Sequence, residues 1–177
     1  ASRLAFADRA RYMADADFVD MPTDGLLDPA YLAARARLID PLRAMGLASA
    51  GEPPWQHPAD FTSDRPRPRK GTSQFVIKDR FGDMISATTT IEAGFGSRIM
   101  VDGFLLNNEL TDLSFLPEEG GVPVANRVEG GKRPRSSMAP TVVFHAGAPV
   151  LLVGSPGGAN IIPYVAQTLI AILDWNL

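Results

Sequence analysis

The order of the predicted secondary structure along the chain indicates an α+β fold. Two early segments have apolar residues at helical spacing, β-rich runs follow them, and a last helical pattern covers 161–173. Helices and strands are therefore grouped rather than alternating, which favours α+β over a doubly wound parallel sheet. One domain is expected, because 177 residues with 45% hydrophobic content can bury an ordinary core.

The two early segments predict amphipathic helices. The first spans 3–13, and the second begins at Asp28-Pro29, where aspartate can accept the free N–H groups of the first turn and proline is tolerated. Asp40-Pro41 is expected to end the second helix. The apolar residues at helical spacing are Leu4, Phe6, Ala7, Ala10 and Met13 in the first helix, and the apolar stripe of the second is Tyr31, Leu32, Leu38 and Ile39.

A proline-rich segment, residues 48–71, separates these helices from the strands. Its prolines exclude regular structure, and basic residues concentrate just before Gly71. We expect a solvated linker, with a basic binding tail as the alternative, although the prolines and two aspartates dilute the charge. The residues concerned are Pro53, Pro54, Pro58, Pro66 and Pro68, and Arg65, Arg67, Arg69 and Lys70.

Strand-like patterns begin after Gly71. The runs 73–79 and 84–92 flank a four-residue turn and predict one β-hairpin, and the runs 141–145 and 150–154 predict a second. Residues 104–106 are a further candidate strand, and 117–135 form a long loop of the kind that often has a function. The glycines of 154–158 lie at the start of the last helix, whose predicted buried face is Ile161, Ile162, Val165, Leu169, Ile172 and Leu173.

Composition excludes several kinds of chemistry. The chain has no cysteine, which rules out a thiol nucleophile, a disulfide and a thiolate metal site within it. His57 and His145 have no metal-ligand or triad spacing, so we expect neither a metal nor a cofactor. A net charge of −3 argues against nucleic acid as a partner, and no apolar run reaches the roughly 18 residues of a membrane span. Any catalytic chemistry must therefore come from hydroxyls, carboxylates or backbone groups.

Four short motifs follow one another in the chain. They are Gly71-Thr72-Ser73-Gln74, Leu105-Leu106-Asn107-Asn108-Glu109 with Asp112, Lys132-Arg133-Pro134-Arg135-Ser136-Ser137-Met138, and Gly154-Ser155-Pro156-Gly157-Gly158. Each is weak alone, but the ordered set resembles the gamma-glutamyltransferase family of N-terminal-nucleophile hydrolases. Similarity at Thr88-Thr89-Thr90, Phe95-Gly96 and Ala7-Asp8-Arg9 extends the resemblance to nearly the whole chain.

The resemblance implies a precursor that cuts itself between Gly71 and Thr72. Residues 1–71 would then be the C-terminal part of a large subunit, and 72–177 the N-terminal part of a small catalytic subunit. The fold implied is a four-layer αββα sandwich, of which this chain holds a part. The partners implied are the remainder of both subunits and a glutathione-like γ-glutamyl substrate. Because the chain lacks an initial Met and stops just after a helical pattern, we expect both ends to be cuts through a longer protein.

Thr72 is the implied nucleophile, and its chemistry agrees with that role. A threonine hydroxyl needs a base, and a free α-amine with a pKa near 7.7–8.0 can serve. Before cleavage that nitrogen is an amide, so processing would switch the enzyme on. Gly71 would allow the strained geometry of the attack. Without the other motifs, Thr72 would be interpreted only as the start of a strand.

The remaining catalytic assignments also come from the resemblance. Thr90 would contact the nucleophile through its hydroxyl, and Gly157 and Gly158 would form the oxyanion hole. Backbone N–H groups at a helix start do favour negative charge, which supports the second role independently. The alternatives are a strand surface for Thr90 and an ordinary turn for the glycines.

Substrate recognition is assigned to five further positions. Glu109 and Asp112 would receive the α-ammonium of the glutamyl group, and Ser136 and Ser137 its α-carboxylate. Glu92 stands where the family often has asparagine and would add a third acidic group near the ammonium. Arg135 stands where an apolar residue is commoner. Outside the family context, the charged and hydroxyl pairs would be interpreted as solvated loop faces.

The predicted function is γ-glutamyl acyl transfer or hydrolysis, with this chain as an inactive, uncut fragment. One alternative is an acylase on another amide, of the cephalosporin or polyglutamate type. A second is a non-catalytic α+β assembly domain. The resemblance implies a periplasmic or extracellular location, and the cytoplasm is the alternative.

Overall fold

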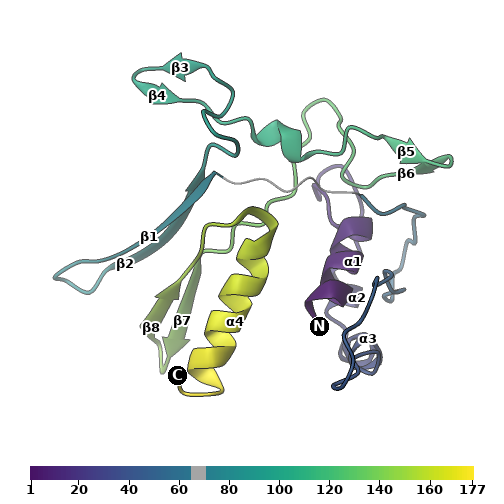
Figure 1. The fold of residues 1–177 in the computed structure, drawn as a ribbon, viewed down its shortest axis with the longest axis horizontal. Coiled ribbons are helices and arrows are strands. Elements are labelled where there is room, and N and C mark those ends of the chain that lie inside the picture. Colours follow the sequence, from purple (N-terminus) through teal and green to yellow (C-terminus); the bar gives the residue numbers. More distant parts are fainter. Residues whose placement is uncertain (65–70) are drawn as a thin grey trace. The chain divides into compact units, whose positions relative to one another are not determined.

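The computed structural model describes residues 1–64 and 71–177 and confirms the α+β class (Figure 1). The chain divides into two compact units. Unit 1 comprises Ala1–Pro66 and Leu110–Arg135, and unit 2 comprises Arg67–Glu109 and Ser136–Leu177. Among the described residues, every sheet is a two-stranded antiparallel hairpin.

Unit 1 begins with three helices: α1 (Ser2–Tyr12), α2 (Thr23–Leu26) and α3 (Pro29–Ala36). The predicted start of α3 is confirmed, because the Asp28 carboxylate accepts a hydrogen bond from the Tyr31 backbone N–H at 2.8 Å. The helix ends at Ala36, earlier than the predicted stop at Asp40. The sequence pattern does not predict the short helix α2.

The apolar stripe of α1 is partly buried, whereas that of α3 is buried only at Tyr31. In α1 the buried residues are Leu4, Asp8 and Tyr12, which are spaced four apart and share one face. Asp8 is buried because it accepts hydrogen bonds from Tyr31 Oη at 2.9 Å, Arg35 Nη2 at 3.1 Å and the Gly51 N–H at 2.7 Å. A polar residue with satisfied hydrogen bonds thus lies on the buried face of α1. Leu32, Leu38 and Ile39 are exposed.

The proline-rich segment has no helix or strand in its described part, as predicted. Most of its residues are exposed, but it has fixed contacts. Trp55 packs edge-on against Tyr12 at 6.0 Å between ring centroids and stacks with Phe61 at 6.3 Å. The Asp64 N–H donates to Ala10 O at 2.9 Å. Arg65, Arg67, Arg69 and Lys70 lie outside the described residues, and the basic-tail alternative lies with them.

Unit 1 is completed by 110–135, the region in which a long loop is predicted. A small hairpin of β5 (Glu118–Glu119) and β6 (Val122–Pro123) interrupts that loop. Leu113, Val124 and Ala125 are buried beside it in the chain. The hairpin is tied to the proline-rich segment, since the Thr62 N–H donates to Pro123 O at 3.0 Å.

Unit 2 contains both predicted hairpins. β1 (Thr72–Lys78) pairs with β2 (Met84–Thr90), and the Asp79 carboxylate caps the turn by accepting from the N–H groups of Phe81 and Asp83. β7 (Thr141–His145) pairs with β8 (Ala148–Val153). Ser86 Oγ of β2 donates to Val153 O at 3.2 Å, which joins the two hairpins.

Shorter elements complete unit 2. β4 (Phe104–Leu105) confirms the candidate strand and pairs with β3 (Met100–Val101), which the pattern does not predict. The 3₁₀ helix η2 (Gly158–Asn160) leads into α4 (Ile161–Leu173). Only Ile161 and Val165 of the predicted α4 face are buried, and Ile172 and Leu173 are exposed. No helix in the described parts of the chain has the length and apolar character needed to cross a membrane.

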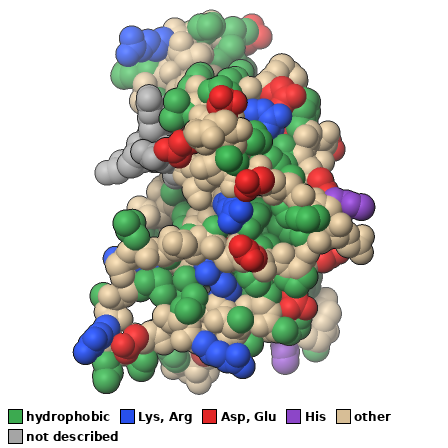
Figure 2. All heavy atoms as spheres, turned by 90° about the vertical axis from the view of Figure 1, so that its right-hand side faces the viewer, with side chains coloured by type: hydrophobic (Ala, Val, Ile, Leu, Met, Phe, Trp, Pro, Cys, Tyr) green, Lys and Arg blue, Asp and Glu red, His purple; other side chains and the backbone are tan. Residues whose placement is uncertain are grey.

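Many large apolar side chains are exposed in both units. Figure 2 shows one face, on which hydrophobic side chains reach the surface between acidic and basic ones. In β1, neighbouring residues are exposed on both faces of the strand: Phe75 at 46%, Val76 at 51% and Ile77 at 53%. An isolated two-stranded hairpin is marginally stable, so these faces have little packing of their own.

Candidate active site

Thr72 and Thr90 face each other at the open end of the first hairpin. The antiparallel register pairs them directly, so their side chains lie on the same face. The Thr72 hydroxyl donates to Thr90 Oγ1 at 3.3 Å. The contact expected for Thr90 is therefore present, and the hairpin register creates it.

The Thr90 hydroxyl also contacts the bond that would be cut. It donates to the carbonyl oxygen of Gly71 at 3.3 Å and accepts a hydrogen bond from the Glu92 N–H at 2.8 Å. One hydroxyl thus contacts both the Thr72 hydroxyl and the Gly71 carbonyl. A donor on that carbonyl would stabilise the negative charge that develops during the attack.

Gly71 is required for a reason that the sequence pattern does not reveal. A Cβ atom built at this position would lie 2.1 Å from the carbonyl oxygen of Glu92. Glu92 itself is 4% exposed and has a φ of 71°, in the left-handed region that non-glycine residues seldom adopt. The backbone after β2 therefore folds tightly against the backbone before β1.

Gln74 links strand β1 to the glycine-rich segment, a contact that the sequence pattern does not predict. It lies two residues after Thr72, on the same face of β1. Its amide donates to Ser86 Oγ at 3.0 Å and accepts from the Thr88 hydroxyl. A Cβ atom on Gly154 would lie within 2.2 Å of the Gln74 side chain. The period-two spacing from Thr72 is the signal that could have identified it.

Gly157 and Gly158 form the turn that starts the last helix. Their φ angles are 141° and 56°, which L-residues with side chains rarely adopt. Gly158 opens η2, and the Asn160 N–H donates to Gly157 O at 3.1 Å. Glycines therefore set the backbone conformation of the predicted oxyanion hole.

The predicted ammonium-binding acids lie on a single 3₁₀ helix, η1 (Glu109–Asp112). The Glu109 N–H donates to Asn107 Oδ1 at 3.0 Å, which caps its start. The carbonyl of Asp112 accepts from Asn126 Nδ2 at 2.8 Å. Both acids are partly buried. The boundary between the two units follows Glu109, so Asp112 belongs to unit 1 and the other predicted site residues to unit 2.

The serine pair continues directly from unit 1. Ser136 is exposed, and its hydroxyl accepts from the Met138 N–H at 3.0 Å. Ser137 is half-buried. Arg135, the residue before them, has a side chain that is only 6% exposed and pairs with Asp64 at 2.8 Å. Burial lowers the pKa of Arg135, and the Asp64 charge opposes that shift.

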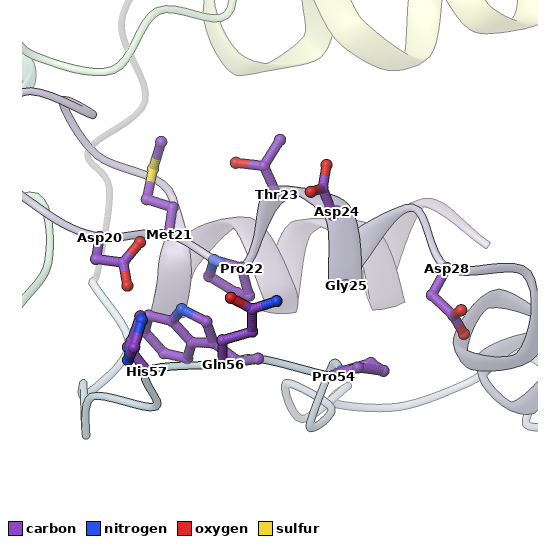
Figure 3. Close-up of a pocket in the computed structure, with 11 residues that line it drawn as sticks. Asp20, Met21, Pro22, Thr23, Asp24, Gly25, Asp28, Pro54, Gln56 and His57 are labelled. Carbon is purple, nitrogen blue, oxygen red and sulfur yellow. The ribbon is translucent and has the colours of Figure 1, made fainter.

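Unit 1 also has a pocket of about 590 Å³ (Figure 3). Its lining comes from two segments, 20–28 and 54–57, and includes the carboxylates of Asp20, Asp24 and Asp28. None of the predicted site residues lines it. In the described part of the chain, no group of three His, Asp or Glu side chains could hold a metal ion.

A pair of threonine hydroxyls beside a backbone carbonyl, and a glycine turn at a helix start, are groups that a hydrolase with a threonine nucleophile can use. The sequence comparisons identify the family: the model of the family described as gamma-glutamyltranspeptidase matches residues 1–177. The chain belongs to this gamma-glutamyltranspeptidase family.

Known relatives agree with that membership. A glutathione hydrolase proenzyme of Bacillus subtilis is 43% identical over 98% of this chain and 30% of the relative. An acylase ACY 1 proenzyme of a Pseudomonas species is 32% identical over 100% of this chain and 29% of that protein. The gamma-glutamyltranspeptidase of Pseudomonas nitroreducens, solved with L-DON, is 40% identical with a TM-score of 0.52, covering 59% of this chain and 57% of that one. The chain thus spans about 30% of the length of the two proenzymes.

Proposed function

We propose that this chain is the part of a γ-glutamyl acyl-transfer enzyme that surrounds its self-cleavage point, with Thr72 as the nucleophile. The observation that carries the proposal is the Thr90 hydroxyl, which contacts both Thr72 Oγ1 and Gly71 O. Family membership supports it, and so does the word proenzyme in the names of both relatives. The glutathione hydrolase is the more similar of the two, which favours a glutathione-like donor.

Self-cleavage would proceed as an acyl shift from nitrogen to oxygen. The Thr72 hydroxyl attacks the Gly71 carbonyl carbon, and its proton ends on the departing Thr72 nitrogen. The Thr90 hydroxyl donates to the carbonyl oxygen as it gains charge. Water then opens the ester, leaving a Gly71 carboxylate and a free Thr72 α-amine. That amine is the base the mature nucleophile needs.

In turnover, the same hydroxyl would attack the γ-amide carbon of the donor. The C–N bond breaks, and the donor's amine leaves with the proton that the Thr72 α-amine took from the hydroxyl. Gly157 and Gly158 hold the oxyanion through their backbone N–H groups, and water or an amino acid releases the γ-glutamyl ester. The α-ammonium is received by Glu109, Asp112 and Glu92. The α-carboxylate is received by the hydroxyls of Ser136 and Ser137.

The proposed organisation divides the chain at the cleavage point. Residues 1–71 belong to a large subunit and 72–177 to a small one, and the remainder of both completes a four-layer αββα sandwich. The exposed apolar residues of β1 and β2 support this, because hairpins of this size are stabilised by further strands or helices. The proposed location is periplasmic or extracellular, with the cytoplasm as the alternative.

A pair of donors tests the substrate assignment. We expect the full-length protein to turn over a γ-glutamyl anilide at least about 100-fold faster than a glutaryl anilide that lacks the α-amine, because two or three carboxylates would lose their ionic partner. Glu109→Gln and Asp112→Asn should each shrink this preference. Glu118→Gln, on the exposed strand β5, is the matched control and should leave it unchanged. Equal turnover of both donors by the wild type would contradict the assignment.

An acylase acting on another amide is the second candidate. The 32% identical acylase proenzyme favours it. This candidate predicts the opposite outcome of the same assay, with the glutaryl donor preferred. The reaction type and the role of Thr72 would be unchanged.

A further inference from the structure

The basic residues just before the serine pair all have partners inside unit 1. Lys132 is 3% exposed, and its ammonium donates to Ala125 O at 2.7 Å. Arg133 binds the Asp15 carboxylate through its backbone N–H at 2.8 Å and its Nε at 3.0 Å. Arg135 pairs with Asp64. The sequence pattern places these three basic residues on a loop surface. In the structure, their contacts fix the backbone that leads into Ser136.

Among the ion pairs of these basic residues, the pair of Arg135 with Asp64 is the one in which both side chains are buried. The side chains of Arg135 and Asp64 are each 6% exposed, and their charged groups are 2.8 Å apart. The guanidinium also donates to Arg9 O at 3.3 Å and Met13 O at 3.4 Å, carbonyls at the C-terminal end of α1. Carbonyls at the C-terminal end of a helix carry partial negative charge and favour a cation. The buried pair is thus supported by additional hydrogen bonds, as a stable buried ion pair requires.

Asn126 connects this pair to the acidic side of the proposed substrate site. It is 0% exposed. Its Nδ2 donates to Asp112 O at 2.8 Å and to Asp64 Oδ2 at 3.3 Å, and its Oδ1 accepts from the Arg135 N–H at 3.3 Å. One buried amide therefore binds the backbone of Asp112 and the backbone of Arg135, the residue directly before Ser136.

From these contacts, and on the basis of the proposed function, we propose that Asn126, Asp64 and Arg135 are positioning residues that set the substrate specificity of the site. They fix the backbone of Asp112, which would bind the α-ammonium, relative to the point where the chain enters Ser136 and Ser137, which would bind the α-carboxylate. Neither the resemblance nor the comparisons assign these three residues a role. Arg135, which departs from the family pattern, is explained by its partner Asp64.

The test uses the full-length protein with the γ-glutamyl and glutaryl anilides. Asn126→Ala and Asp64→Asn should each raise KM for the γ-glutamyl donor about tenfold, with kcat changed by less than about twofold, because the zwitterion is held less precisely. KM for the glutaryl donor, which has no ammonium to place, should change by less than about twofold. The matched control is Asp60→Asn. Asp60 forms an ion pair with Arg11 at 3.4 Å, but its side chain is 76% exposed. This variant should change KM for neither donor.

Removing one partner of a buried ion pair can unfold a protein, so a second variant is needed. Replacing both Asp64 and Arg135 with leucine removes the pair without leaving a lone buried charge, a change that proteins often tolerate. It should reproduce the tenfold KM effect. Folded variants with unchanged KM for the γ-glutamyl donor would overturn the inference alone, as would an equal loss of kcat on both donors. A wild type that turns over neither donor would overturn the proposed function and this inference with it.

Discussion

Replacing Thr72 with alanine is expected to leave the full-length protein as one uncut polypeptide, with turnover reduced more than about 10³-fold. The alanine has no hydroxyl to attack Gly71, so no free α-amine is formed, and the mature nucleophile is also lost. Mass spectrometry of the intact protein and turnover of a γ-glutamyl anilide measure the two effects. Thr72→Ser should retain cleavage, because it keeps the hydroxyl.

The neighbouring serine supplies the control for this variant. Ser73 is the next residue of β1, is exposed, and lies on the opposite face of the strand. Ser73→Ala should therefore be cut normally and should retain its turnover. A cut or active Thr72→Ala protein would exclude Thr72 as the nucleophile.

Gly71→Ala is the second variant with a large expected effect. The added Cβ would lie 2.1 Å from the carbonyl oxygen of Glu92, so one of the two backbone segments must move. The Gly71 carbonyl would shift relative to the hydroxyls of Thr72 and Thr90. Because misplacement of about 1 Å can cost about 100-fold in rate, we expect cleavage to slow by about that factor, followed as the loss of uncut chain with time.

Gly94→Ala is the matched control for this substitution. Gly94 lies two residues after Glu92, and a Cβ atom there would meet nothing within 4 Å. The Gly94→Ala protein should be cleaved at the wild-type rate. If Gly71→Ala is cut at the wild-type rate, the close approach to Glu92 does not hold the scissile bond in place.

Local sequence signals predict the elements of this fold well. The Asp28-Pro29 cap places the start of α3, and the turn residues between the β-rich runs place the hairpin of β1 and β2. These signals act over a few residues, so one sequence is enough to identify them. The hairpin register then pairs Thr72 with Thr90, because strand alternation and turn length fix which residues are opposite.

The buried polar contacts of unit 1 could not be predicted in this way. Asp8 lies on the buried face of α1 because it meets Tyr31, Arg35 and Gly51, which lie 23 to 43 residues away. The pairing of Arg135 with Asp64 spans 71 residues. Composition marks such residues as surface, and only the three-dimensional contacts show that their charges are satisfied inside.

The family was predictable from the sequence, whereas the contacts within the candidate site were not. The ordered motifs give the family, which the family model confirms. They do not reveal that Glu92 restricts position 71 to glycine, that Gln74 contacts Gly154, or that Asn126 holds Asp112. Each of these contacts depends on how separate segments pack. Local patterns in a single sequence do not predict that packing.

The most direct test of the central claim is the intact mass of the purified full-length protein together with the N-terminal sequence of its parts. Two polypeptides are expected, and the second should begin at Thr72, with Gly71 at the end of the first. A catalytically active protein that remains a single chain, or one that is cut at another bond, would contradict the assignment of Thr72 as the nucleophile freed by self-cleavage.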